Sequence, residues 1–101
     1  MNDRIAIHVD ADLEELIPGF LDNRHKDAAR LAALLEAGDF AEIRRIGHSM
    51  KGAGGGYGFD AITDIGAAIE EAALCRDAAA IAASAVELSD YLSRVDVIIE
   101  P

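Results

Sequence analysis

The stretch from residue 28 to residue 54, AARLAALLEAGDFAEIRRIGHSMKGAG, contains two amphipathic helical segments joined by a tight connection. Gly38 is suited to the left-handed residue that follows a helix, so the first helix should end at about Ala37. Asp39 can cap the next helix, and Glu42, three residues on, completes a pattern like the capping box. Because so short a connection favours antiparallel neighbours, this hairpin predicts a helical bundle.

Helical periodicity continues on both sides of this hairpin. Pro18 is expected to break the upstream segment, leaving a short N-terminal helix that ends near Leu16 or Ile17. Asp60 and Asp77 are expected to cap two further helices. Residues 4–9 alternate apolar and polar side chains but are too short to define a sheet.

The apolar residues of these segments recur at spacings of three and four, which predicts one buried stripe on each helix. The predicted inward-facing residues are Leu13, Leu16, Ile17, Phe20, Leu21, Ala28, Leu31 and Leu35, then Phe40, Ile43, Gly47, Met50 and Gly54, then Ile62, Ile65, Ile69 and Ala72, and finally Ile81, Ala85, Leu88, Leu92, Val95 and Ile99. We therefore predict an all-α fold, an antiparallel up-down four-helix bundle with a short extra N-terminal helix.

Composition and charge narrow the class of protein. The 101 residues suffice for one domain, residues 1–101, with a core of its own. A formal net charge of -10 argues against nucleic acid or a membrane as partner, because contacts to phosphates need clustered basic residues. The longest nearly apolar stretch, residues 78–86, is about half of a membrane span, and the N-terminus has no secretory signal. We expect a cytoplasmic monomer, either free-standing or a terminal domain.

His48 is the candidate site residue. On a helix it lies about 100° from Gly47, off the predicted apolar stripe. Its neighbours one turn away include Arg44, Arg45 and Lys51, and this strip of the helix contains no carboxylate. An accessible imidazole is largely neutral near pH 7 and can act as a nucleophile, and the lysine can stabilise a dianionic group beside it. The pattern therefore predicts a ring nitrogen that carries a phosphoryl group transiently.

Five of the nine glycines lie between Gly52 and Gly58. A glycine in a helix interior costs about 1 kcal/mol relative to alanine, so the helix should fade within this run. Gly52 and Gly55 fall on the same side as His48, where absent side chains leave the imidazole open to another protein's backbone. Gly54, on the core side, is expected to permit close helix packing.

The run HSMKGAGGGYGF, residues 48–59, resembles the signature of histidine-containing phosphotransfer (HPt) domains. The positions that carry the resemblance are His48, Met50, Lys51, Gly52, Ala53, Gly54, Tyr57, Gly58 and Phe59. The helical hairpin upstream and a downstream helix with Ile62, Ile65, Ile69 and Glu70 also fit, so the resemblance covers approximately residues 10–98.

The resemblance implies a phosphorelay role without autonomous kinase activity. His48 would exchange a phosphoryl group, on Nε2, with the aspartate of a receiver domain in a response regulator or a hybrid sensor histidine kinase. Lys51 would stabilise the phosphate, and Gly52 would leave clearance for the partner. The chain would need no cofactor of its own, since Mg²⁺ would come from the receiver domain. The other residues expected to contact the partner are Arg44, Arg45, Ser49 and Gly55.

These residues are compatible with other functions and roles. The alternative function is a binding-only bundle that docks a receiver domain or other regulator without being phosphorylated. The KGAGGGYG run lacks the order of a phosphate-binding loop and follows a helix, and His48 has no further metal ligands at helical spacing. The remaining residues of note are expected to be structural, namely His8 and His25 on the surface, Cys75 as a small buried residue, and Tyr57 and Phe59 against the end of the bundle.

Overall fold

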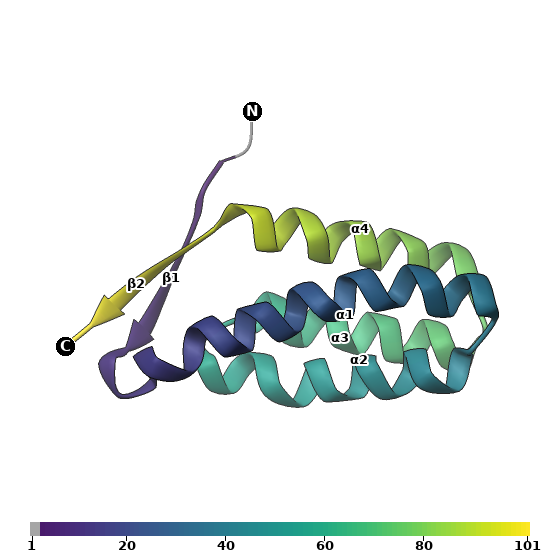
Figure 1. Ribbon diagram of the computed structural model, residues 1–101, viewed down its shortest axis with the longest axis horizontal. Coiled ribbons are helices and arrows are strands. Elements are labelled where there is room, and N and C mark those ends of the chain that lie inside the picture. The colour runs from purple at the N-terminus through teal and green to yellow at the C-terminus, as the bar shows by residue number, and fades with distance from the viewer. Residues whose placement is uncertain (1–2) are drawn as a thin grey trace.

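Four long helices dominate the computed structural model, which describes residues 3–101, and they run alternately up and down (Figure 1). They are α1 (Ile17–Ala37), α2 (Phe40–Gly54), α3 (Asp60–Leu74) and α4 (Ala78–Arg94). Two short 3-10 helices flank the first pair, η1 (Ala11–Leu16) before α1 and η2 (Gly55–Tyr57) after α2. The predicted all-α bundle is confirmed, and η1 is its short extra N-terminal helix.

The connection between α1 and α2 has the predicted geometry. Gly38 ends α1 in the left-handed region, with φ at 71°, and the Asp39 side chain accepts the N–H of Glu42 at 3.1 Å. The Glu42 side chain does not complete a capping box, because it forms ion pairs with Arg30 on α1 and with Arg45. The carboxylate therefore links the first two helices instead of capping the second.

The other predicted helix starts are confirmed in two of three cases. Pro18 lies in the first turn of α1, where its missing N–H costs nothing. Asp77 caps α4 by accepting the N–H of Ala80 at 3.1 Å. Asp60, predicted as a cap, is instead the first residue of α3, and Phe59 occupies the cap position without a side-chain hydrogen bond.

The core follows the predicted stripes. The predicted residues that are completely buried are Leu31, Ile43, Met50, Ile62, Ile69, Ile81 and Leu88. Phe20 stacks on Phe59 with ring centroids 5.2 Å apart and contacts Tyr57 at 4.7 Å, so both aromatic residues pack at the end of the bundle as predicted. Leu16 was predicted to face inward but is 52% exposed, because the 3-10 turn that ends there rotates it away from the core.

The two ends of the described chain form a parallel two-stranded sheet, which the sequence analysis did not predict (Figure 1). Strand β1 (Ile5–Asp10) pairs with β2 (Val95–Glu100). The last helix therefore ends at Arg94 and does not continue to Ile99. Val95 and Ile99 fit helical spacing, but with Val97 between them they also alternate as a strand does, and pairing with β1 satisfies their backbone groups.

Cys75 also differs from its prediction. It was expected to be buried but is exposed, because α3 ends at Leu74 and the thiol lies beyond the buried face of that helix. The chain turns there through Arg76, whose φ is 53°. His8 and His25 are exposed, as predicted.

Candidate functional site

Two glycines on facing helices bring α2 and α3 into close contact. A Cβ added to Gly47 would lie 2.7 Å from the backbone nitrogen of Glu70, and one added to Gly66 would lie 2.5 Å from that of Lys51. No side chain fits at these distances, so the two backbones touch. The same contact places Glu70 of α3 opposite the α2 face that holds His48.

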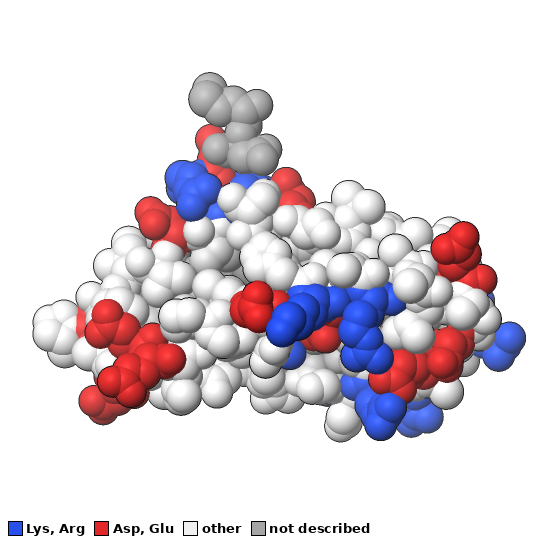
Figure 2. Space-filling view, in the orientation of Figure 1, with Lys and Arg blue, Asp and Glu red and all other residues white. Residues whose placement is uncertain are grey.

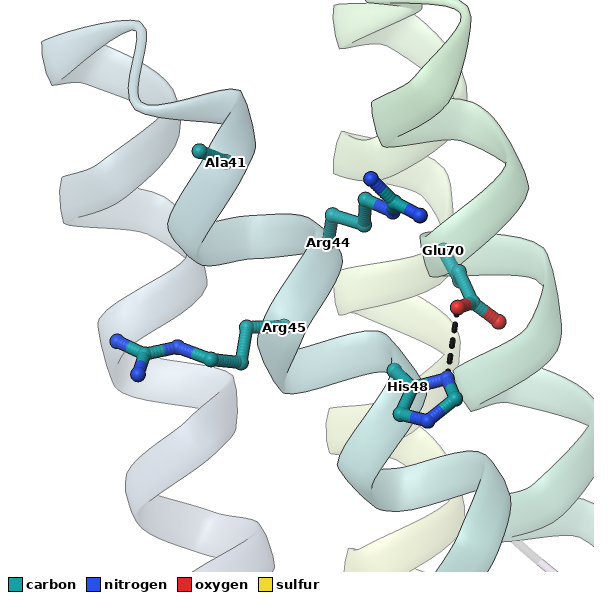
Figure 3. Close-up of a pocket in the computed structure, with 5 residues that line it drawn as sticks. All are labelled: Ala41, Arg44, Arg45, His48 and Glu70. Atoms are coloured by element: carbon teal, nitrogen blue, oxygen red, sulfur yellow. Dashed lines mark hydrogen bonds and ion pairs between the residues drawn. The ribbon is translucent and has the colours of Figure 1, made fainter.

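Glu70 holds both polar residues of the predicted site. Its Oε2 lies 2.8 Å from His48 Nδ1 (Figure 3), and its Oε1 accepts a hydrogen bond from Lys51 Nζ at 3.1 Å. The Glu70 side chain is only 15% exposed, whereas that of His48 is 71% exposed. An ionised carboxylate can only accept, so Nδ1 of a neutral ring must donate, and Nε2 keeps its lone pair.

The electrostatics of Glu70 favour its ionised form. The hydrogen bond from Lys51 lowers the pKa of this carboxyl group most, and the hydrogen bond from His48 lowers it further. Burial opposes both effects but is weaker. Glu70 is therefore an anion over the whole neutral range, and the imidazole tautomer that it selects persists.

Thr63 of α3 fixes the end of α2 next to the site. Its hydroxyl donates to the carbonyl of Lys51 at 3.0 Å and accepts the N–H of Gly55 at 2.8 Å. A Cβ on Gly54 would lie 2.6 Å from the Thr63 nitrogen, which confirms the predicted close packing at that glycine. The hydrogen bonds and the close packing of α3 thus hold the backbone that carries Lys51.

The two glycines predicted to leave His48 open differ in their surroundings. A Cβ added to Gly52 would meet nothing within 4 Å. A Cβ on Gly55 would come into ordinary contact with Thr63 and Asp60, at 3.6 and 3.7 Å. Gly52 therefore borders open space, whereas Gly55 lies against α3.

The two arginines before His48 point in different directions (Figure 3). Arg44 extends toward α3, on the side of Glu70, and Arg45 extends toward α1. With Ala41 and His48, these residues line a shallow pocket. In the unphosphorylated chain the charges that lower the pKa of Glu70 are those of Lys51 and His48, so Arg44 shares the pocket with this carboxylate without pairing with it.

Two of the three cations in the predicted patch pair with carboxylates, one on α2 and one on α3. Arg45 pairs with Glu42, and this hydrogen bond is the largest cause of the lowered pKa of that carboxyl group. Lys51 pairs with Glu70, which comes from α3, and the strip of α2 around His48 itself contains no carboxylate, as predicted. Within residues 3–101, no carboxylate lies within ion-pair distance of Arg44.

Ser49 lies on the other side of His48 from Glu70. It lines a hollow between α1 and α2 together with Phe20, Ala53 and Tyr57. The imidazole therefore stands between a charged pocket on the α3 side and a partly aromatic hollow on the α1 side.

Residues 3–101 contain neither a cluster of metal ligands nor a helix that could cross a membrane. No group of three or more His, Cys, Asp or Glu side chains is placed there to hold a metal ion. None of the helices in this range combines the length and the apolar character that a bilayer span requires.

The four-helix bundle thus presents an exposed imidazole that a carboxylate holds through Nδ1 and that a lysine flanks. Residues 15–97 match the family model of the Hpt domain, and the chain belongs to this family, as the resemblance implied. No curated protein and no solved structure gives a significant match. Family membership places the chain in His-Asp phosphorelay signalling, where Hpt domains are phosphotransfer carriers rather than true enzymes and interact with receiver domains and kinases.

Proposed function

We propose that His48 is the residue that carries the phosphoryl group, on Nε2, and exchanges it with the aspartate of a receiver domain. The observation that carries this proposal is the 2.8 Å contact between His48 Nδ1 and Glu70 on a ring whose side chain is 71% exposed. Because Nδ1 is occupied and faces α3, the free lone pair of Nε2 is directed away from that helix. A neutral nitrogen nucleophile with an open approach is what the transfer requires.

The proposed step conserves atoms and charge. Nε2 attacks phosphorus, the bond between phosphorus and the aspartyl oxygen breaks, and its electron pair stays on the aspartate as a carboxylate. The ring keeps its Nδ1 proton and becomes a phosphorylated imidazolium, whose positive charge Glu70 stabilises through the existing hydrogen bond. The reverse step returns the N–P electron pair to Nε2 and regenerates a neutral ring.

Lys51 and Gly52 support this transfer in different ways. Lys51 is one turn beyond His48, and its mobile ammonium can turn to the phosphoryl oxygens. Gly52 leaves room for the partner's backbone, since nothing lies within 4 Å of a Cβ placed there. We expect Mg²⁺ held by the receiver domain to neutralise the transferring group, so the chain needs no cofactor of its own.

The partner is expected to cover the imidazole from both sides. On the α3 side it would meet the pocket with Arg44, and on the α1 side the hollow with Ser49. Arg45, turned toward α1, extends the same surface. Gly55 lies nearer the edge of this surface than Gly52, because it packs against α3.

Transfer from a phosphorylated receiver domain tests the proposal. The wild-type chain, incubated with radiolabelled receiver phosphate and Mg²⁺, should gain an acid-labile label that His48→Gln does not gain. His25→Gln, which changes an exposed histidine on α1, is the matched control and should be labelled like wild type. Equal labelling of His48→Gln and wild type would refute the proposal, and binding of the receiver without any label would favour the adaptor function.

A second test uses the open space at Gly52. Gly52→Val should weaken receiver binding about tenfold or more, since a β-branched side chain would stand between the imidazole and the partner. Gly52→Ala, with a single methyl group, is the control for the effect of losing glycine. Binding measured by titration calorimetry that is the same for all three proteins would remove the clearance role.

A further inference from the structure

Lys51 has two incompatible tasks in the phosphorylated state. In the structure its ammonium donates to Glu70 at 3.1 Å. To neutralise a phosphoryl group on Nε2, the same ammonium must turn toward the other side of the ring. Glu70 would then lose the hydrogen bond that lowers its pKa most.

A charge count shows why this matters. Before phosphorylation, neutral His48, Lys51 and Glu70 sum to zero. After it, a dianionic phosphoryl group on a cationic ring brings the sum to -1: the ring cation attracts the Glu70 carboxylate, but the phosphoryl dianion repels it and draws Lys51 away from it. One further cation near Glu70 would restore the balance and keep the carboxylate on Nδ1.

We propose that Arg44 supplies this cation and is a positioning residue that holds Glu70 on His48 Nδ1 while Lys51 neutralises the phosphoryl group. The inference rests on the proposed function of His48 as the phosphoryl carrier. Arg44 extends toward α3 on the Glu70 side and lines the same pocket as Glu70 and His48 (Figure 3). Unlike Arg45, which pairs with Glu42, it has no ion-pair partner within residues 3–101 and is free to respond.

The surroundings of Glu70 leave few other candidates. On α3, the residues one turn before and one turn after it carry no charge, and they are Gly66, Ala67, Ala73 and Leu74. Compensation must therefore come from α2, the helix packed against this face. Of the cations on α2, Lys51 is engaged by the phosphoryl group and Arg45 by Glu42.

The test uses phosphoramidate, a small donor that needs no protein partner. Its P–N bond breaks, ammonia leaves, and a new N–P bond forms at His48 Nε2. Ring ¹⁵N spectra of the phosphorylated proteins at pH 7.5 then report whether Nδ1 keeps its proton. In Arg44→Ala the ratio of protonated to deprotonated phosphorylated ring should fall about two- to fivefold, the range expected for an exposed ion pair.

A second readout is the loss of the phosphoryl group in buffer. It should slow by the same factor in Arg44→Ala, because the N–P bond breaks most easily from the protonated ring. Arg44→Lys should restore both values, since it restores the charge. Arg30→Ala, which changes an exposed arginine on α1 that also pairs with Glu42, is the matched control and should behave like wild type, and the spectra of all unphosphorylated proteins should agree.

Three results would overturn the inference. They are an unchanged ring spectrum in phosphorylated Arg44→Ala, an equal effect of Arg30→Ala, and a failure of Arg44→Lys to restore the signal. Absence of any phosphoramidate product at His48 of the wild type would also overturn it, because the state that it describes would not form. Failure of transfer from a receiver domain alone would refute only the proposed function.

Discussion

The interface between α2 and α3 and the interface between α1 and α4, called the two seams below, both join antiparallel helices, but they are built differently. At α2–α3, Gly47 and Gly66 bring backbone atoms into direct contact. At α1–α4 the helices meet through alanines and aliphatic side chains, and an apolar hollow remains. Val86 beside this hollow is 70% exposed, and the part of α4 around it forms a largely uncharged area of the surface (Figure 2).

The α2–α3 seam therefore sets the position of a functional side chain, whereas the α1–α4 seam chiefly buries apolar area. Because the glycines at α2–α3 bring the two backbones into contact, these helices can pack in only one alignment. In that alignment Glu70 lies at hydrogen-bonding distance from His48. Side-chain contacts at α1–α4 bury apolar area, including Leu31 and Ile81, and the hollow beside them leaves space into which side chains can shift. The chemistry of the chain thus lies on its most tightly determined seam.

The largest expected effect comes from adding one carbon to the tight seam. Gly66→Ala should lower the free energy of unfolding by about 3 kcal/mol, since its Cβ would clash with the backbone of Lys51 at 2.5 Å and neither helix can yield locally. Gly52→Ala is the control, and it should raise stability by up to about 1 kcal/mol because the new methyl group has open space. Urea denaturation measures both. Similar values for the two variants would show that the seam is adaptable.

The next prediction concerns Glu70, the side chain that the α2–α3 seam positions. Glu70→Ala should slow phosphorylation of His48 by phosphoramidate about tenfold, because the ring loses the charge-assisted hydrogen bond that keeps Nε2 unprotonated. Glu71→Ala, on the neighbouring exposed residue, is the control and should react like wild type. An unaltered rate in Glu70→Ala would mean that the contact does not select the tautomer.

The same distinction explains which features could be predicted from the sequence. Helix ends such as Gly38 and Asp39 depend on a few consecutive residues, so local patterns predicted them. Glu70 lies 22 residues from His48, and only the packing of α2 on α3 brings the two together. The positions of Gly47 and Gly66, both in otherwise apolar stripes, were the available signal for that packing.

The strand pair shows a different limit of sequence patterns. Residues 95–99 fit both a helical stripe and a strand alternation, and a short segment cannot distinguish the two. The pairing between β1 and β2 joins residues about ninety positions apart, and no local pattern reports it. Cys75 was mistaken for a buried residue because composition, not its place just past the end of α3, guided the prediction.

A smaller effect is expected at Lys51. Lys51→Ala should slow transfer to or from the receiver domain about fivefold with little change in fold, since the residue is exposed and one exposed pair is worth up to about 1 kcal/mol. Lys26→Ala, which removes an exposed lysine paired with Asp22 on α1, should leave the rate unchanged. Equal rates in Lys51→Ala and wild type would remove its assigned role.

The same variant has a defined pH consequence. The pKa of Glu70 is lowered in the folded chain, chiefly by Lys51, so the contact contributes to stability above the ordinary carboxyl value of about 4.3 and is lost as the pH falls through the lowered value. Lys51→Ala should therefore raise the pKa of Glu70, and the contact with His48 should be lost at a higher pH. Carbon-detected NMR titration of the carboxyl group measures this shift, and a pKa that does not move would contradict the pairing.

The smallest effect should come from adding three carbons to the loose seam. Ala82 lies beside the hollow between α1 and α4. Leu31, Ile81 and Val86 leave room there for the larger side chain of Ala82→Leu. Its free energy of unfolding should stay within about 1 kcal/mol of wild type, because the gain in apolar burial and the cost of rearrangement are similar in size. Phosphorylation of His48 should be unchanged, since the site lies on the other seam. In the same urea experiment, a loss of stability as large as that of Gly66→Ala would mean that the two seams are equally constrained. Close glycine packing would then not explain why the site lies on the α2–α3 seam.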